Sequence, residues 1–286
     1  MSLALVYLAR GADGGLPAAK AFFKAYHVYP PRCPHELIVI TKGWSGIAGR
    51  NELEQLAQAN SARLVDLPDD GFDWGAYMRL APLLTHTWVC FLNTHSRPCV
   101  DGWLNLLKVS AEAPGMNIGA VGATASWQTL APVLPLPSVN AEYNNPLIYP
   151  LRLIRNTVRF VTNIRDFPSF PNPHLRSNAF IVRRELFVDF AAAQQIPRCK
   201  RDALKLESGR VGFTAFLGAR GLKMLVAGAD SRVYGSKEWV DSGIFRAPGQ
   251  PNLLVADNQT IAYDMADNNS KRNFEKSAWG RILTNL

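Results

Sequence analysis

A cluster of polar side chains follows an apolar stretch in the segment WVCFLNTHSRP, at positions 88–98. Residues 88–92 are apolar and rich in β-formers, which predicts a buried strand. The next residues bring an amide, hydroxyls, an imidazole and a guanidinium, and Pro98 cannot continue the ladder of the strand. In open α/β sheets, ligands bind beyond the carboxyl ends of the strands. The segment therefore predicts a ligand site at this strand end.

Asn93 and His95 are the best candidates in this cluster for direct contact with a ligand. Their nitrogen and oxygen atoms suit phosphate oxygens, ribose hydroxyls or a metal that accepts mixed ligands, such as Mn²⁺. Alternatively, the two residues only cap the strand end, with the His95 imidazole bonded to a backbone carbonyl. We favour the ligand interpretation and predict a phosphosugar, with no metal site assigned and His95 as the candidate metal ligand.

Basic residues follow several of the predicted strands. Arg10, Lys42 and Arg97 each come directly or closely after an apolar run. Because parallel strands bring their carboxyl ends to one edge of a sheet, these cations are expected to converge there on a diphosphate leaving group, whose charge must be neutralised. The alternative is that they are solvated loop charges.

Aspartates surround Gly71 ahead of a predicted helix. Carboxylates in this position can accept hydrogen bonds from the free N–H groups of a helix N-terminus. A sugar site also needs carboxylates that accept hydrogen bonds from hydroxyl groups. We therefore predict Asp70 and Asp73 as donor-binding residues, while expecting at least one aspartate of the group to serve only as a cap.

The first half of the chain alternates between predicted strands and helices. Apolar runs predict strands at 3–9, 36–42, 62–67, 88–93 and 117–125. Helical spacing of apolar residues predicts helices at 17–28, 51–61, 73–84 and 103–113. Near-continuous apolar strands separated by helices are typical of a mostly parallel sheet that helices cover on both faces. We predict an α/β fold of this kind.

The second half is less regular. Residues 126–150 carry five prolines and few charges, which predicts a loop or lid. A strand with a helix start is expected at 174–186, a long helix at 201–221 and a final strand at 222–228. No linker is evident, so we predict one domain, 1–286. Its parts would be a donor-binding half at 1–125, an acceptor-side half at 126–230 and an irregular C-terminal strap at 231–286.

Composition narrows the class of protein. No apolar run approaches the roughly 20 residues of a membrane span, and the N-terminal MSLALVYLARGADGG is interpreted as a first strand rather than a signal peptide. The four cysteines form no CxxC pair, which favours a reducing cytoplasm over a disulfide framework. With 31 basic and 23 acidic residues, the net charge of +8 predicts an anionic partner.

Several α/β activities are disfavoured by missing motifs. The first predicted strand is followed by RGADGG, which lacks the GxGxxG spacing of a dinucleotide site. There is no Walker A loop and no GxSxG nucleophile elbow. Nucleic-acid binding is also disfavoured, because no basic face is interleaved with stacking aromatic residues.

The order of segments resembles that of GT-A nucleotide-sugar glycosyltransferases. The segment DDGFDWGAYMRLAPLLTHTWVCFLNTHSRP resembles the stretch that runs through the donor pocket, and WLNLL and NIGAVGATASW follow in the same order. The nearest resemblance is to glycosyltransferase-like proteins of bacterial polysaccharide clusters, including rhamnan-synthesis types. The resemblance covers residues 3 to about 230. It implies a GT-A-like fold and a nucleotide-sugar donor.

The resemblance also implies roles for particular residues. Within KLESGRVGF, Glu207 matches the acid that acts as general base in inverting members, although a surface Glu paired with Lys205 or Arg210 is the alternative. Ser177 and Asn178, within PHLRSNAFIVRRELF, match an acceptor-side strand. The family's Asp-x-Asp is replaced by Asn-Thr-His at 93–95, so dependence on Mn²⁺ or Mg²⁺ is expected to be weak.

Two further segments suggest partners. The tail mixes aromatic residues with amides and acids, as carbohydrate subsites do, so Asp257 and Asn258 are acceptor-binding candidates unless they only satisfy their own loop backbone. Segment 151–165 has arginines beside an apolar stripe at helical spacing. Such a helix can make peripheral contact with anionic lipid. We favour the alternative that it packs on its own domain and leaves the arginines in water.

The sequence therefore predicts a cytoplasmic glycosyltransferase, a hexosyltransferase that uses a nucleotide-sugar donor and a glycan or lipid-linked glycan acceptor in bacterial surface polysaccharide synthesis. The alternative is a catalytically inactive GT-A-like protein that binds a glycan or a partner protein, and the lost Asp-x-Asp is its main support.

Overall fold

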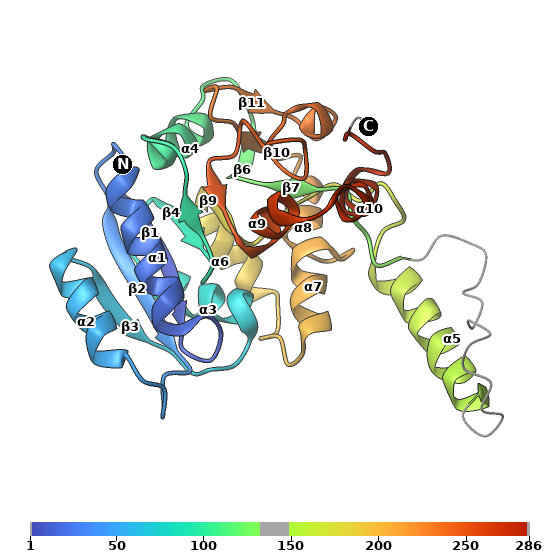
Figure 1. Ribbon diagram of the computed structural model, residues 1–286, viewed down its shortest axis with the longest axis horizontal. Coiled ribbons are helices and arrows are strands. Elements are labelled where there is room, and N and C mark those ends of the chain that lie inside the picture. Colours follow the sequence, from blue (N-terminus) through green and yellow to red (C-terminus); the bar gives the residue numbers. More distant parts are fainter. Residues whose placement is uncertain (1, 132–148, 285–286) are drawn as a thin grey trace.

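The structure, a computed structural model, describes residues 2–131 and 149–284, with the side chains of 149–154 left out. Eight strands form one sheet in the order β11-β10-β6-β9-β4-β1-β2-β3 (Figure 1). Strand β9 runs antiparallel to both of its neighbours, β11 runs antiparallel to β10, and the remaining pairs are parallel. The predicted α/β class with a mostly parallel sheet is confirmed by this arrangement.

The N-terminal elements follow the predicted alternation. The strands are β1 (Leu3–Arg10), β2 (Glu36–Lys42), β3 (Arg63–Asp66) and β4 (Trp88–Leu92). The helices between and after them are α1 (Gly15–Val28), α2 (Arg50–Ala59), α3 (Phe72–Leu80) and α4 (Trp103–Ala111). The predicted helix at 73–84 ends early, and its last residues form the short 3₁₀ helix η1 (Ala81–Leu83), whose second residue is Pro82. A proline cannot donate the backbone hydrogen bond that would continue the α-helix.

The later strands and the short pairs complete the architecture. The sheet also contains β6 (Ile118–Gly122), β9 (Ala179–Arg183), β10 (Lys223–Ala227) and β11 (Val233–Tyr234). Two separate pairs form outside it, β5 (Arg97–Pro98) with β12 (Val255–Ala256), and β7 (Ala125–Ser126) with β8 (His174–Leu175). The predicted strand at 117–125 is thus divided, because its last residue leaves the main sheet. Most of the predicted loop at 126–150 lies outside the described residues.

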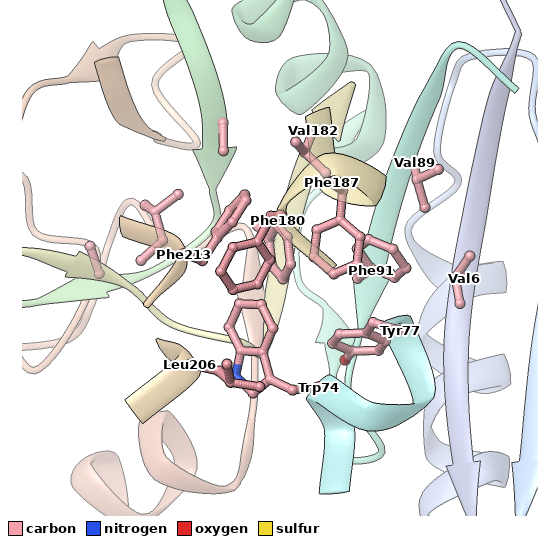
Figure 2. Packing of buried hydrophobic residues seen from close by; sticks show 14 of the residues in the cluster. Val6, Trp74, Tyr77, Val89, Phe91, Phe180, Val182, Phe187, Leu206 and Phe213 are labelled. Atoms are coloured by element: carbon pink, nitrogen blue, oxygen red, sulfur yellow. The ribbon is translucent and has the colours of Figure 1, made fainter. Parts of the chain in front are cut away.

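Helices cover both faces of the sheet, and the apolar side chains of the strands are buried beneath them. On one face, Phe22 of α1, Leu53 of α2 and Trp103 of α4 are fully buried against the strands. The other face carries an aromatic cluster in which Trp74 stacks on Phe180 and Phe187 (Figure 2). Burial of this kind stabilises a fold by about 25 cal/mol per Å² of apolar surface. The packing fixes α3, which carries Trp74, relative to the strand ends.

Two predictions for the second half were wrong in detail. The predicted helix at 201–221 is two helices, α7 (Lys200–Ser208) and α8 (Phe213–Ala219). The break falls at Gly209, where any Cβ would lie 2.6 Å from the Lys205 carbonyl oxygen. The tail, expected to be loop-like, contains α9 (Asn258–Met265) and α10 (Asn268–Trp279). Its Trp279 and Trp239 are buried in the core, so the tail is an integral part of the packed structure.

Candidate functional site

A cleft of about 320 Å³ lies at the carboxyl edge of the sheet, beyond the ends of β1 and β4. The register of the strands places these ends together, since Arg10 pairs with Lys42 and Tyr7 pairs with Leu92. The first turn of α3, the loop between β8 and β9, helix α7 and the start of α9 close the cleft on its other sides. The predicted site residues that line it are Arg10, Asp73, Asn93, His95, Ser177, Asn178, Glu207, Asp257 and Asn258.

Two carboxylates, Asp73 on α3 and Glu207 on α7, face the cleft from different elements. The backbone N–H of Ser177 donates to Glu207 Oε1 at 2.9 Å, which orients that carboxylate. Among residues 2–131 and 149–284, no hydrogen bond or ion pair engages the Asp73 carboxylate. Asp73 is therefore a half-buried acceptor available to a ligand.

Both carboxylates hold protons more tightly than usual. Burial, and after it the charge of Glu207, raises the pKa of Asp73 to about 6. Burial also raises the pKa of Glu207, although the Arg176 charge and the Ser177 N–H oppose this. A carboxylate with a raised pKa is a stronger base at neutral pH, which is what proton abstraction from a hydroxyl requires.

The imidazole of His95 is held at the cleft edge by Asp13. His95 Nε2 lies 3.1 Å from Asp13 Oδ1, and its side chain is a quarter exposed. Asn93 uses its side-chain oxygen locally, accepting from the His95 backbone N–H at 3.1 Å, and the Ser96 Oγ atom lies 2.9 Å away. Asn93 thus caps the strand end, and this cap presents His95 to the cleft.

The acceptor-side candidates form one rigid wall. Asp257 is the N-cap of α9 and accepts from Gln259 N and Thr260 N, while its second carboxylate oxygen binds the Arg176 guanidinium at 2.6 Å. Asp257 is fully buried. It therefore serves the wall itself, as the alternative sequence interpretation held, and leaves Asn258 beside it at the cleft surface.

Ser177 and Asn178 lie at the junction between β8 and β9, on the same wall. The Asn178 backbone carbonyl accepts from Asn93 N at 3.0 Å and from the Ser96 hydroxyl at 2.6 Å. Its side-chain oxygen accepts from the Thr124 hydroxyl. These bonds join the end of β4 to the β9 side of the cleft and fix the position of both walls.

Lys42 lies outside the cleft and serves the backbone around Gly71. Its side chain is 1% exposed, and Nζ donates to the carbonyl oxygens of Asp70 at 2.7 Å and Phe72 at 2.9 Å. Burial lowers the pKa of Lys42, with Asp69 opposing the shift. The sequence placed Lys42 among the donor-binding cations, and the structure places its charge beneath the loop that enters α3.

Arg10 and Asp70 connect the cleft to a neighbouring cavity of about 660 Å³. Arg10 and Phe72 line both spaces. Arg10 is paired with Asp69 at 2.8 Å, and Asp70 is paired with Arg79 at 2.9 Å. Asp70 therefore faces this outer cavity and not the cleft. Together the two spaces form a continuous surface for an elongated, partly anionic ligand.

Arg97 does not reach the cleft. It is exposed on β5, where its backbone pairs with Ala256 of β12. The prediction overlooked Asp13, Arg176 and Lys200, which line the cleft. Asp13 lies in the loop after the first strand, so the strand-end argument applies to it. Arg176 lies inside the segment predicted as a strand at 174–186, and it reaches the cleft because β9 runs antiparallel to its neighbours. Lys200 has no such signal, because only the packing of α7 brings it to the cleft.

The described residues contain no group of three or more His, Cys, Asp or Glu side chains placed to hold a metal ion. The cleft brings together the carboxylates of Glu207 and Asp73, the guanidinium of Arg10 and the imidazole of His95, which Asp13 holds. Such an arrangement can bind a ligand with an anionic end and a hydroxyl-rich end.

Comparison with known proteins gives distant structural likenesses. No protein-family model and no curated protein matches the sequence. The chain is similar to CMP:2-keto-3-deoxy-manno-octonic acid synthetase complexed with CTP, at 10% identity and a TM-score of 0.43 over 79% of this chain and 89% of that one. It is similar to 4-diphosphocytidyl-2C-methyl-D-erythritol synthase from Anaerococcus prevotii, at 10% identity and a TM-score of 0.44 over 79% and 86%.

A third similar structure is glucosyl-3-phosphoglycerate synthase from Mycobacterium tuberculosis, in complex with Mn²⁺, UDP and glucosyl-3-phosphoglycerate. The identity is 16% and the TM-score 0.37, over 64% of this chain and 57% of that one. All three neighbours are nucleotidyl- or glycosyl-transferring enzymes. Likeness at these TM-scores does not assign an activity to this chain.

Proposed function

We propose that this chain is a glycosyltransferase that moves a hexose from a nucleotide-sugar donor to a glycan or lipid-linked glycan acceptor. The supporting observation is the convergence of Arg10 and His95 with Asp73 and Glu207 in one cleft at the carboxyl edge of the sheet. The GT-A resemblance of the sequence adds to this support. A role in bacterial surface polysaccharide synthesis, on the inner face of the membrane, is part of the proposal.

In this proposal the donor lies along the two connected cavities. The diphosphate contacts Arg10 and His95, and the sugar hydroxyls donate hydrogen bonds to Asp73. The acceptor enters along the wall formed by Ser177 and Asn258. Glu207 takes the proton of the attacking hydroxyl as the bond between the sugar and the phosphate breaks. The raised pKa of Glu207 supports this role.

We propose that the leaving group is stabilised by fixed cations rather than by a divalent metal. His95 stands where the family pattern has an aspartate, and its Nε2 lies 3.1 Å from Asp13 Oδ1. A guanidinium and an imidazole N–H close to the diphosphate would stabilise developing negative charge. Mn²⁺ or Mg²⁺ is then an optional addition to the site.

A thermal-shift panel tests the donor class directly. UDP-, GDP-, CMP- and dTDP-sugars and CTP are compared, each with EDTA, Mn²⁺ or Mg²⁺, for the wild type and for His95→Gln. We expect one class of nucleotide sugar to raise the melting temperature in EDTA, and the His95→Gln variant to lose most of that rise. Stabilisation by CTP with no response to any nucleotide sugar would contradict the proposal, as would binding that EDTA abolishes.

A turnover assay separates the active enzyme from an inactive binding protein. Slow hydrolysis of the stabilising donor, measured as release of the nucleoside diphosphate, is expected because water can replace the acceptor. Stabilisation by the donor without any release would favour the inactive alternative.

A further inference from the structure

Helix α5 (Tyr149–Asp166) extends away from the rest of the molecule (Figure 1). Its attachment lies at its C-terminal end. Arg201 of α7 donates to Asn163 and, at 3.0 Å, to Asp166, and the following Phe167 is fully buried. The end of α5 is thereby held by α7, the helix that also carries Glu207.

The face of α5 opposite this attachment is apolar. At about 100° per residue, Val158 lies about 140° around the helix from Asn163, the residue that meets the body. Val158, Val161 and Ile164 are 57%, 58% and 43% exposed. A helix on a globular protein normally turns its apolar stripe inward. Here the stripe faces outward, so the expectation that segment 151–165 packs it against its own domain was wrong for these residues.

The border of this apolar face is basic. Arg155 and Arg159 are exposed along one border of it, and Arg165 lies on the stripe itself, within about 20° of Val158 around the helix and nearer the C-terminal end. The sequence from 149 to 165 contains no acidic residue, and Asp166 at the end is already paired with Arg165 and Arg201. The helix therefore presents an exposed apolar stripe beside the positive charges of Arg155 and Arg159, which no acidic residue of 149–165 compensates.

We propose that α5 docks in the plane of an anionic lipid surface, with Val158, Val161 and Ile164 inserted among the acyl chains and the arginines at the headgroups. An amphipathic helix with a basic polar border binds membranes in this way. No helix in the described ranges is long and apolar enough to cross a bilayer. This inference goes beyond the proposed glycosyltransferase activity and does not depend on it.

Docking through α5 sets the position of the cleft. Arg201 on α7 holds α5, and Lys200 and Glu207 on the same helix line the cleft. Helix α7 therefore connects the docking helix to the cleft. Under the proposed function, this connection would keep the cleft at the membrane that carries a lipid-linked acceptor.

Co-sedimentation of the full chain with vesicles tests the inference. Vesicles of phosphatidylcholine alone are compared with vesicles containing one third phosphatidylglycerol, at low and high NaCl. We expect binding to the anionic vesicles, weakened by salt. The double substitution Arg155→Gln/Arg159→Gln should lower the partition coefficient by roughly 10- to 30-fold, since each basic residue near an anionic surface contributes about fivefold. Val158→Ser/Val161→Ser should lower it similarly.

Matched controls keep the outcomes distinct. Val211→Ser removes an exposed valine elsewhere, and Lys24→Gln/Lys276→Gln removes two exposed charges from α1 and α10. These variants should bind vesicles as the wild type does. Equal binding to both vesicle types, or binding unchanged by the α5 substitutions, would overturn the proposal.

A second copy of the chain is the alternative occupant of this face. Sedimentation velocity of the wild type over a concentration series should show no dimer that Val158→Ser/Val161→Ser abolishes, and such a dimer would overturn lipid docking. Donor binding, measured by the thermal shift, should be unchanged in all α5 variants. Failure of the proposed transferase activity would show in that shift and not in vesicle binding.

Discussion

Glu207 and Asp73 face the same cleft but differ in their partners. The Ser177 N–H holds the Glu207 carboxylate in place, whereas no described residue bonds to Asp73. An oriented carboxylate suits proton transfer, and an unengaged one suits hydrogen bonds from a ligand. This difference supports the two roles proposed for them, Glu207 as the base and Asp73 as the acceptor of hydrogen bonds from the donor sugar.

Glu207→Gln should lower turnover by about 10²- to 10⁴-fold, the usual contribution of a positioned acid–base group. The amide oxygen can still accept from Ser177 N–H, so donor affinity should hold. Steady-state kinetics and the donor-induced thermal shift check the two parts. Glu185→Gln on α6 (Arg184–Ala192) is the control, since the side chain of Glu185 is 88% exposed. Wild-type turnover in Glu207→Gln would refute the assignment.

Asp73→Asn should stabilise the protein at neutral pH. The pKa of Asp73 is about 6 in the folded state against an ordinary 3.8, so the folded state binds more protons between these values and its stability falls as pH rises through them. Asparagine removes this loss. We expect a gain of about 1–2 kcal/mol at pH 7.5, below the roughly 3 kcal/mol ceiling because the side chain keeps solvent contact.

Urea denaturation from pH 4 to pH 8 measures this gain, which should shrink toward zero at the acid end. Asp264→Asn, at an exposed position of α9, is the control. A destabilised Asp73→Asn variant at pH 7.5 would mean that the carboxylate is structural. The same variant should also bind the donor more weakly, since Asp73 is its proposed hydroxyl acceptor.

Lys42 helps to fix the position at which helix α3 begins. The ammonium group holds the backbone of Asp70 and Phe72 from below, and Gly71 between them adopts a left-handed conformation with φ of 71°. Any Cβ at Gly71 would lie 2.8 Å from the Gly75 Cα. The turn that presents Asp73 therefore needs both the glycine and the buried cation.

Lys42→Met should destabilise the fold by about 2–4 kcal/mol, because two partly buried carbonyl oxygens lose their charged donor. Donor-induced stabilisation should fall too, since the first turn of α3 would shift. Lys24→Met, at an exposed position of α1, is the control and should change little. If Lys42→Met folded normally and lost only donor binding, Lys42 would be a ligand cation after all.

Apolar runs in the sequence correctly predicted the central strands of the sheet. The apolar runs of β1, β2 and β4 are fully buried strands, and the strand-end rule brought Arg10, Asn93 and His95 to one cleft. The same rule failed for Lys42, because its long side chain turns under the neighbouring loop. Strand periodicity cannot predict that turn.

The C-terminal helices were missed although their signals were present. The sequence DNQT contains the capping box of α9, with Asp257 and Thr260 exchanging side-chain to backbone hydrogen bonds. Helix α9 has little amphipathic spacing, so periodicity did not reveal it. At 201–221 the error was the opposite one: the helical spacing of apolar residues continues through Gly209, but the helical backbone ends there.

The C-terminal segment that begins at residue 231 forms one wall of the cleft, through residues 257–259. Its Asp257 pairs with Arg176, and both residues are nearly or fully buried. Removing one member of a buried pair leaves the other charge without compensation. The stability of the entire fold thus depends on a contact between two segments far apart in the sequence.

Asp257→Ala should cost about 3–5 kcal/mol, because it removes both the partner of Arg176 and the cap of α9. Asp257→Asn keeps a capping oxygen and should cost less. The double variant Arg176→Met/Asp257→Asn should recover part of the loss, since no buried charge is then left alone. Urea denaturation of the series gives the coupling energy. Additive losses in the double variant would contradict a paired role.

The placement of β9 has a consequence for synthesis on the ribosome. Strands β3, β2, β1 and β4 lie next to one another in this order, and all four are complete by residue 92. Strand β9 lies between β4 and β6 in the sheet. Strand β6 ends at Gly122 and β9 begins at Ala179, so 56 residues separate them. At about 5–20 residues per second, the nascent chain waits about 3 to 11 s for the strand that belongs between them. During that interval the exposed edge of β4 and the apolar β6 can pair directly, and this mispairing is the one that a chaperone acting on the nascent chain would have to prevent.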